Sequence, residues 1–589
     1  MGQRLGARRR FLQGLLVGLG AAALALAAGG LGWLDRVEAW TWDWRETALA
    51  RPGPATDRVR LILLDQESLD WAREENGLSW PWPREVYGVV ADYCARMGAR
   101  ALAFDVLFTE PSLYGVADDE SFGAGLARFG RTAVAVFLGD RAGAARGWPP
   151  NLAGRGPAVE GAAPWLAAEG PGGLSFSRAA LPVPEISAAA AILGNVHLQP
   201  DPDGVYRRIA PLALFDGRPV VALGLAAYLA AAPGTTIHAA ASRVAVGDLG
   251  IPVEDRGAAV LRFRGPSGTH RAYSAAAVLQ SELRLRAGEE PVIRDPEAFR
   301  DAYVLFGFSA PGLYDLRSSP LGGVYPGVEI QATLVDNLLS GDFLRPAPPL
   351  AGPSLALALA LATGILASFF SSPLGTAVLG VLVSPAPVAL AFWTYQRGYW
   401  LPLAAPELAV AAATGLALVA NYASEGRQKR FLKGAFRQYL SPDVVEQLIA
   451  HPERLKLGGE RRTLSIFFSD LQGFTSISEA LEPEALTALL NDYLSAMTDL
   501  IHEEGGTVDK YEGDAIIAFW NAPLDRPDHA ACAVRAALRC QARLAELRPE
   551  FRERVGRDLF MRIGLNTGPA VVGNMGSRNR FDYTMLGDA

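Results

Sequence analysis

The segment Val508-Asp-Lys-Tyr-Glu-Gly-Asp-Ala-Ile-Ile-Ala-Phe-Trp520 places four charged side chains directly before a short apolar run. An apolar run that follows a turn signal is typical of a buried β-strand, so we predict a strand over Ala515–Phe519. Gly513 supplies the turn of the resulting hairpin. The segment therefore raises the question of why Lys510, Glu512 and Asp514 should lie at the mouth of a buried hairpin.

The composition indicates a membrane protein with several domains. The chain has 589 residues, of which half are hydrophobic and 20% are charged, and this length exceeds that of a single domain. The net charge of -7 is mild, and we expect no nucleic-acid partner. Cys94, Cys532 and Cys540 have no spacing typical of disulfides or metal sites, so we expect them in the protein core.

Four apolar runs are long enough to cross a bilayer at about 20 residues per crossing. We predict transmembrane helices over 11–32, 350–370, 374–395 and 399–421. The last run is the weakest, because it contains Pro402, Pro406 and Glu407. The first run is open to a second interpretation as a cleaved signal peptide, although its length favours an uncleaved anchor.

Basic residues flank the first and the last run. They are Arg4, Arg8, Arg9 and Arg10 before the first run, and Arg427, Lys429, Arg430, Lys433 and Arg437 after the last. The positive-inside bias places both flanks in the cytoplasm. The sequence thus predicts a multi-pass protein of the plasma (inner) membrane, in contact with its lipid, with a cytoplasmic N-terminus over 1–10 and an outer domain over 34–348.

The outer domain is predicted to be α/β with a mostly parallel sheet, because apolar strands alternate with helices along it. Asp65, Glu67 and Asp105 lie at or just past the C-terminal ends of two predicted strands. Ligands bind at that edge of open α/β sheets, so these three are candidate ligand residues. The alternative is that they cap helices and turns.

Several segments of the outer domain carry a family resemblance. They are Trp80-Pro-Trp-Pro-Arg84, 98–111, Tyr325-Pro-Gly-Val-Glu-Ile330 and Asp336-Asn-Leu-Leu339. These segments resemble the CHASE2 family of extracellular sensor domains. The resemblance implies a sensor that follows one transmembrane helix and precedes three more, with an unknown extracytoplasmic ligand.

The inner part begins with predicted juxtamembrane transducing helices over 423–459 and continues as a second domain over 460–589. A strand over Arg462–Phe468 ends at Asp470, so Asp470 and Asp514 lie at the ends of strands that would be neighbours in one sheet. A glycine loop follows Asp470, and its backbone N–H groups suit phosphate. Paired carboxylates beside phosphate suit Mg²⁺ bound to a nucleotide. From spacing alone, the two aspartates are equally well explained as turn residues.

Six segments of the inner part carry a second resemblance. They are 436–442, 468–478, 490–493, 509–514, 562–568 and 582–588. In this order they resemble the catalytic domain of class III adenylate/guanylate cyclases, which implies a ferredoxin-like α/β fold. The expected fold class is thus a multidomain membrane protein with an α/β sensor, about four transmembrane helices and an α/β cyclase domain.

The second resemblance implies a site that holds two metal ions, Mg²⁺ or Mn²⁺. The metal ligands would be Asp470, Asp514 and the backbone of Leu471, and the metals would activate the ribose 3′-hydroxyl for attack on the α-phosphate. The expected phosphate-facing residues are Gly473, Phe474, Thr475 and, as a phosphate-contacting arginine, Arg562.

The base is expected to be read by Lys510 and Thr584. Lys510 only donates hydrogen bonds, so it suits N1 of adenine and opposes the N1–H of guanine. Thr584 falls on the position that faces N6 of adenine in the family. We therefore expect an adenylate cyclase that converts ATP to 3′,5′-cyclic AMP and pyrophosphate, with a guanylate cyclase as the near alternative.

The family's sites form between two catalytic domains, and this chain has both the metal aspartates and the base-reading pair, so a homodimer is implied. Class III domains continue past the position of Ala589 into a helix with an Asn and an Arg that stabilise the transition state. We therefore expect the catalytic domain to be incomplete and the chain as given to be slow or inactive. A non-catalytic membrane sensor stays open as a distant alternative.

Overall fold

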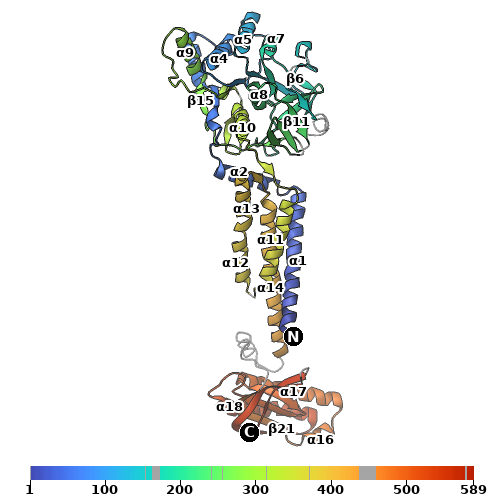
Figure 1. Ribbon diagram of the computed structural model, residues 1–589. Helices are drawn as coiled ribbons and strands as arrows, with labels where there is room; N and C mark the ends of the chain where they lie inside the picture. Colours follow the sequence, from blue (N-terminus) through green and yellow to red (C-terminus); the bar gives the residue numbers. More distant parts are fainter. Residues whose placement is uncertain are drawn as a thin grey trace. The chain divides into compact units, whose positions relative to one another are not determined.

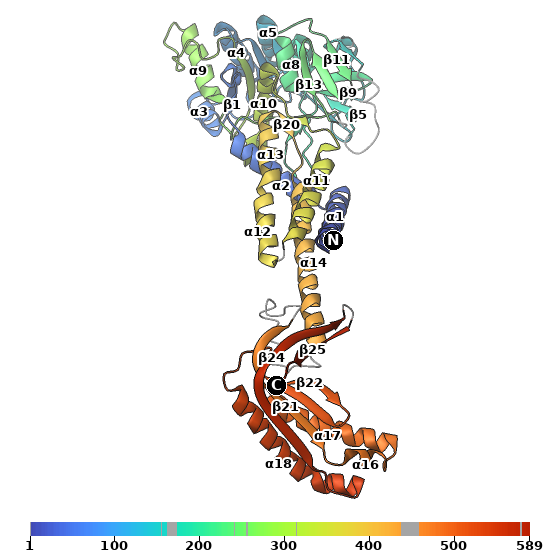
Figure 2. The same ribbon diagram turned by 60° about the horizontal axis from the view of Figure 1, so that its bottom comes forward.

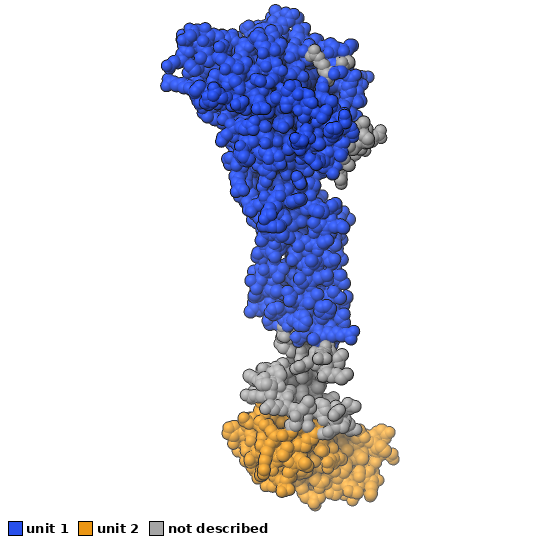
Figure 3. All heavy atoms as spheres, viewed as in Figure 1, with its two compact units in different colours: residues 1–418 blue, residues 419–589 orange. Residues whose placement is uncertain are grey.

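The computed structural model describes residues 2–152, 154, 156–161, 173–240, 242–254, 257–313, 315–370, 372–436, 459–577 and 580–589. The chain forms two compact units, residues 1–418 and 419–589 (Figure 3). Unit 1 contains an α/β domain and a helical bundle, and unit 2 contains a second α/β domain.

A seven-stranded sheet lies at the centre of the α/β domain of unit 1 (Figure 1). Its order is β15-β1-β16-β2-β3-β6, and β7 also pairs with β3. All neighbours are parallel except β3 and β6, which confirms the predicted mostly parallel sheet. The strands are β15 (Arg271–Ser274), β1 (Val59–Leu64), β16 (Tyr303–Phe308), β2 (Ala101–Phe104), β3 (Thr132–Gly139), β6 (Arg178–Ala180) and β7 (Ile192–Asn195).

Successive side chains of these strands enter two different hydrophobic clusters, because side chains alternate across a strand. Leu61 and Leu305 belong to the cluster that includes α8 (Leu223–Ala230) and α10 (Gly327–Ser340). Ile62 and Phe306 belong to the cluster on the other face. That cluster includes α3 (Gln66–Asn76), α4 (Arg84–Arg96), α5 (Val116–Phe129) and α9 (Ala275–Arg286). The sheet is therefore covered by helices on both faces, as parallel sheets require.

Shorter elements complete the α/β domain. A four-stranded sheet joins β4 (Val159–Glu160), β11 (Ile237–Ala240), β12 (Arg243–Val246) and β13 (Leu249–Pro252). A three-stranded sheet joins β5 (Ser175–Phe176), β9 (Leu212–Phe215) and β10 (Arg218–Val221). The remaining elements are β8 (Arg208–Ile209) with β14 (Ala259–Val260), β17 (Leu316–Ser319) with β18 (Gly322–Pro326), α7 (Pro184–Ala189), and the short 3₁₀ helices Thr56–Arg58, Pro150–Leu152 and Pro311–Leu313.

Among the described residues, four helical stretches are long and apolar enough to cross a membrane, Ala7–Gly30, Ala351–Phe369, Pro373–Gln396 and Ala404–Ala423. They belong to α1 (Gly2–Gly30), α11 (Ala351–Phe369), α12 (Pro373–Val383) with α13 (Pro385–Gln396), and α14 (Ala404–Phe436). The last helix begins later than the predicted residue 399. Tyr399–Trp400 instead form β20, which pairs with β19 (Arg345–Pro346).

The predicted transducing segment over 423–459 is only partly described. Residues 423–436 continue α14 without a break, and 437–458 lie outside the described residues.

Helices α1 and α11 approach each other at glycines. A Cβ atom added at Gly18 would lie 2.7 Å from the Cα of Leu361, and one at Gly14 would lie 2.6 Å from the carbonyl oxygen of Gly364. Glycines four residues apart allow such close backbone contact between membrane helices. This contact brings the helix that precedes the α/β domain beside the first helix that follows it.

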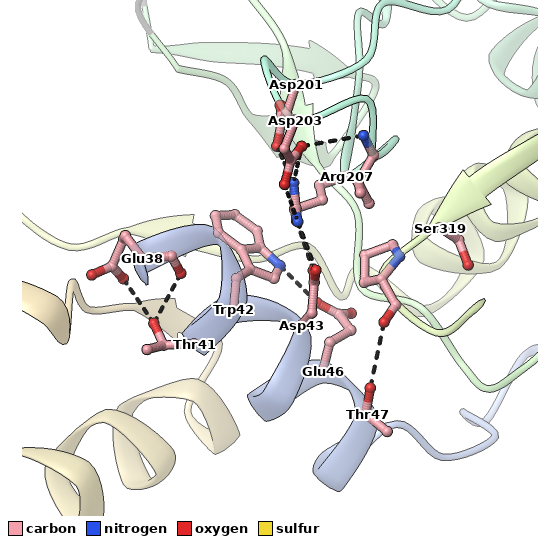
Figure 4. Close-up of polar contacts among 12 residues, drawn as sticks. Glu38, Thr41, Trp42, Asp43, Glu46, Thr47, Asp201, Asp203, Arg207 and Ser319 are labelled. Atoms are coloured by element: carbon pink, nitrogen blue, oxygen red, sulfur yellow. Dashed lines mark hydrogen bonds and ion pairs between the residues drawn. The ribbon is translucent and has the colours of Figure 1, made fainter. Parts of the chain in front are cut away.

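Helix α2 (Asp35–Leu49) joins the bundle to the α/β domain through buried polar contacts (Figure 4). Arg207 forms an ion pair with Asp43 of α2, with Nη2 and Oδ2 separated by 2.8 Å. Glu46 is fully buried and accepts hydrogen bonds from Trp42 Nε1 and from the backbone N–H of Phe263, each at 2.9 Å. At the other end of α2, Glu38 accepts from the backbone N–H groups of residues 403 and 404, just where α14 begins.

Unit 2 contains a five-stranded antiparallel sheet in the order β22-β23-β21-β24-β25 (Figure 2). The elements are β21 (Glu460–Leu471), α16 (Phe474–Ser478), α17 (Pro483–Glu503), β22 (Thr507–Glu512), β23 (Ala515–Trp520), α18 (His529–Val555), β24 (Met561–Ser577) and β25 (Arg580–Leu586). The β-α-β-β-α-β succession with this strand order confirms the predicted ferredoxin-like fold. Helices α17 and α18 form the main core with one face of the sheet, while Phe519 and Tyr583 belong to a smaller cluster.

The buried carboxyl group of Glu46 makes the stability of unit 1 depend on pH. Burial raises the pKa of Glu46 from 4.5 to about 7, against the opposing effect of its hydrogen bonds. The folded state therefore holds a proton that the unfolded state has lost between pH 4.5 and about 7, so stability falls as pH rises through this window by on the order of 3 kcal/mol.

We expect Glu46→Gln to remove this part of the pH dependence, because the amide does not titrate. The measurement is the thermal unfolding midpoint of the full chain in nanodiscs from pH 4.5 to 8, followed by tryptophan fluorescence. Glu67→Gln, on the exposed first turn of α3, is the matched control. An unchanged pH profile in Glu46→Gln would contradict the assignment.

Candidate functional site

Strand pairing in unit 2 brings Asp470 and Asp514 together. Asp470 lies near the end of β21, and Asp514 lies in the turn between β22 and β23. β21 and β23 are antiparallel neighbours, with Ser469 opposite Ile516. The backbone N–H of Leu471 donates to Asp514 Oδ2 at 2.8 Å, which fixes the carboxylate beside the end of β21.

The two carboxylates affect each other electrostatically. Burial raises the pKa of Asp514, the charge of Asp470 raises it further, and the hydrogen bond from Leu471 opposes both. Arg562 lies opposite Asp470 in the ladder between β21 and β24, with its Nη2 3.1 Å from Asp470 Oδ2. The site thus holds two negative charges and one positive charge, so a further cation would be favoured.

A divalent cation fits this pair of carboxylates. Among the residues that the structure describes, no group of three or more His, Cys, Asp and Glu side chains could hold a metal ion. A metal at Asp470 and Asp514 would therefore complete its shell with other oxygen atoms. Mg²⁺ behaves in this way, since it binds one or two carboxylates and otherwise keeps water or takes phosphate oxygens.

The loop after β21 is placed beside the carboxylates. Gly473 adopts φ +71°, which favours glycine, and it precedes the short helix α16 that begins at Phe474. Phe474 packs against the core of unit 2, whereas Thr475 is exposed. The loop therefore continues directly from Asp470 and Leu471 into α16.

Lys510 and Thr584 are connected through Asp509. The register of β22 shifts between Val508 and Lys510, so Asp509 occupies a β-bulge. Neighbouring residues of a strand normally face opposite sides of the sheet, and a bulge interrupts this alternation. Val508 and Asp509 are therefore both buried, and Asp509 is only 6% exposed. Thr584 Oγ1 donates a hydrogen bond to Asp509 Oδ2 at 2.7 Å, while Lys510 is exposed on the same strand.

Sequence reasoning named Lys510 and Thr584 but missed Asp509. Burial raises the pKa of Asp509, and the hydrogen bond from Thr584 and the charge of Lys510 lower it. Its Oδ1 atom is buried without a hydrogen-bond partner in the described part of the chain. Val508 and Asp509 are both buried because of the bulge. A strict alternation of buried and exposed residues along the strand would not predict that Asp509 is buried.

The candidate sensor residues have different environments in unit 1. Asp65 caps α3, since its Oδ1 accepts from the backbone N–H of Ser68 at 2.8 Å. The capping alternative therefore explains Asp65, and Glu67 is exposed on the first turn of the same helix. Asp105 is partly buried, and desolvation, followed by the charge of Asp315, raises its pKa.

Comparisons with known proteins match both halves of the chain. Residues 18–366 match the model of the CHASE2 domain, and residues 459–589 match that of the adenylate and guanylate cyclase catalytic domain. Adenylate cyclase 1 of Rhizobium meliloti (strain 1021) is 35% identical over 156 residues, which are 26% of this chain and 23% of that protein. Adenylate cyclase of Anabaena cylindrica is 34% identical over 166 residues, which are 27% of this chain and 31% of that protein. The match thus spans less than a third of each of these relatives.

Solved structures of similar sequence include the guanylyl cyclase Cya2. It has 42% identity and a TM-score of 0.22, and the match covers 22% of this chain and 67% of that chain. The adenylyl cyclase CyaB from P. aeruginosa has 40% identity and a TM-score of 0.22, and the match covers 22% of this chain and 69% of that chain.

We expect Asp514→Asn to weaken the binding of Mn²⁺ by the full chain about tenfold or more, because a charged ligand is lost. The amide oxygen still accepts from Leu471, so the hairpin should keep its place. Since burial and Asp470 raise the pKa of Asp514, Mn²⁺ binding by the unchanged chain should also weaken as pH falls. Electron paramagnetic resonance of free Mn²⁺ measures both effects.

The matched control is Asp525→Asn, which removes one carboxylate from an exposed position of unit 2. Equal Mn²⁺ affinity in Asp514→Asn and Asp525→Asn would refute the metal assignment.

Proposed function

The chain belongs to the CHASE2-domain family and carries an adenylate/guanylate cyclase catalytic domain, and from this premise we propose that it is a signal-regulated adenylate cyclase of the membrane. The reaction would convert ATP to 3′,5′-cyclic AMP and pyrophosphate. The observation that carries the proposal is the pair Asp470 and Asp514 at one end of the sheet of unit 2, beside the loop 471–475.

Divalent cations at this pair, Mg²⁺ or Mn²⁺, would activate the ribose 3′-hydroxyl and neutralise charge on the phosphates. The chain's own residues would position the nucleotide. Asp470 and Asp514 supply carboxylate oxygens, and the Leu471 N–H keeps Asp514 in place. Arg562, with 68% of its side chain exposed, can leave its ion pair with Asp470 for a phosphate oxygen. The backbone of Gly473, Phe474 and Thr475 would face the phosphates.

The hydrogen bond between Thr584 and Asp509 supports adenine as the base. An ionised carboxylate only accepts hydrogen bonds, so Thr584 gives its hydroxyl hydrogen to Asp509. The lone pairs of Thr584 Oγ1 then suit a donor, such as the N6 amino group of adenine. The O6 atom of guanine is an acceptor and would meet these lone pairs unfavourably, just as its N1–H would meet Lys510.

A homodimer would complete the site, since the family's sites combine the metal aspartates of one domain with the base-reading pair of another. The four apolar helices are consistent with a multi-pass protein. The basic residues near the start of α1 and those beyond the apolar part of α14 favour a plasma (inner) membrane location, with the sensor outside and the cyclase domain in the cytoplasm.

The test is expression of the full reading frame in membranes of a strain without its own cyclases, with ATP or GTP and with Mg²⁺ or Mn²⁺. We expect cyclic AMP as the main product, and a loss of about 10²-fold or more in Asp470→Asn and in Asp514→Asn. Cyclic GMP as the main product would support the guanylate cyclase alternative. No product with either nucleotide would support the non-catalytic sensor.

We expect Asp509→Asn to reduce the preference for ATP over GTP about tenfold, because an amide both donates and accepts and no longer fixes the direction of the Thr584 hydroxyl. The loss should appear mainly as a higher KM for ATP, since Asp509 acts on the base and not on the reacting phosphate. Glu512→Gln, which is exposed on the same strand, is the matched control. An unchanged ratio of kcat/KM values in Asp509→Asn would show that Asp509 only stabilises the fold.

A further inference from the structure

A cavity of about 1010 Å³ lies in unit 1 where α2 meets the α/β domain. Its wall includes Asp35, Glu38 and Trp42 of α2, the turn that contains Asp201 and Asp203, and Trp400 of β20. The volume is in the range of sites for small organic molecules. The proposed reaction does not use this cavity, and the candidate residues Asp65, Glu67 and Asp105 are not part of its lining.

The charge of the lining is negative. Five carboxylates face three guanidinium groups, and the charged residues are Asp35, Glu38, Asp201, Asp203 and Glu254 against Arg36, Arg207 and Arg208. The negative groups outnumber the positive ones, so the cavity attracts cations from solution.

The two inner arginines are already paired with carboxylates. Arg207 is 1% exposed and donates to Asp43, Asp201 and Asp203 (Figure 4). Arg208 donates to Asp201 at 2.5 Å and to Glu254 at 2.7 Å. An anionic ligand would have to displace these carboxylates before it could pair with Arg207, and at Arg208 it would lie beside the charges of Asp201 and Glu254.

The carboxylates still have room for donors. In the described part of the chain, the contacts of Asp201 with arginine use only Oδ2, and the contact of Glu254 uses only Oε2. An ionised carboxylate offers about four acceptor positions on its two oxygens. Asp201 and Glu254 can therefore accept further hydrogen bonds from a cationic ligand without releasing the arginines.

The rest of the lining combines the polar side chains of Asn195, His197 and Gln199 with apolar ones. Phe176 and Trp400 are buried, and Leu174 and Ala213 line the same cavity. His197 lies with its ring 5.0 Å from Phe176, and burial lowers the pKa of its imidazole against the opposing charge of Asp140. A neutral imidazole adds no positive charge, so the apolar side does not offset the carboxylates.

We propose that this cavity is a ligand site of the sensor and that its ligand is a small organic amine, with a cationic head at the carboxylates and an apolar body against Phe176 and Trp400. A metal ion is less suited, because no group of three or more potential metal ligands with suitable geometry occurs among the described residues. Every residue of this site belongs to unit 1, so the proposal does not depend on the reaction proposed for unit 2.

A ligand bound in the cavity would affect the helical bundle. The Arg207–Asp43 ion pair connects the turn with Asp201 and Asp203 to α2. Glu38, which also lines the cavity, accepts from the backbone N–H groups at the start of α14. A cationic ligand that binds these carboxylates would therefore change the same contacts that hold α2 and α14 together.

The experiment titrates phenethylamine into the full chain in nanodiscs and records tryptophan fluorescence, since Trp42 and Trp400 line the cavity. Its counterpart is 3-phenylpropionate, which has a similar size and the opposite charge, and empty nanodiscs correct for partitioning into lipid. We expect saturable binding of the amine and none of the acid. A further titration with added phosphatidylethanolamine tells whether a lipid headgroup amine competes for the site.

One double variant and one single variant test whether the amine binds in this cavity. Asp35→Asn with Glu254→Gln should weaken amine binding about tenfold or more, and Ala210→Trp should abolish it by filling the cavity. Asp57→Asn, an exposed residue outside the lining, should bind as the unchanged chain does. Thermal midpoints without ligand show that each variant is folded.

The proposal is overturned if the amine does not bind at millimolar concentrations, if the acid binds equally well, or if folded variants of both kinds bind as the unchanged chain does. Competition by phosphatidylethanolamine would support the cationic site and assign its ligand to the membrane.

Discussion

Two like charges, Asp470 and Asp514, are held side by side at one end of the sheet of unit 2. Such a pair is unfavourable by itself, because each charge opposes the ionisation of the other. The antiparallel pairing of β21 with β23 and the hydrogen bond from Leu471 to Asp514 hold the pair in place. The core that α17 and α18 form with the sheet stabilises this arrangement, and a bound cation would make it more favourable.

The α2 junction of unit 1 is built differently from the core of the same unit. The two core clusters of the α/β domain consist of apolar side chains on the faces of a parallel sheet. At α2, by contrast, buried charged groups such as Arg45, Glu46 and Arg207 form the contacts. Buried ion pairs recover their desolvation cost only in good geometry, so this junction is more sensitive to bound ions and to pH than an apolar contact would be.

Most elements of unit 1, but not all of their boundaries, follow from local sequence patterns. Strands and spans of unit 1 follow from local patterns, and the structure confirms an α/β sensor with a mostly parallel sheet. Helix α14 begins later than predicted, since Tyr399–Trp400 pair with Arg345–Pro346. Hydropathy alone does not reveal such a pairing, because it joins segments far apart in the sequence.

The sequence by itself determined the apolar spans and the position of Asp470 and Asp514 at strand ends, because each depends on periodicity or turn residues within a short window. The ferredoxin-like fold was implied by the resemblance to class III cyclases. Only the tertiary structure decided the contact between Thr584 and Asp509, which lie 75 residues apart, and the cavity that α2, the turn near Asp201 and Trp400 enclose. The physical reason is that a bulge redirects Asp509 against the alternation of its strand, and that the cavity wall comes from segments that meet only after folding.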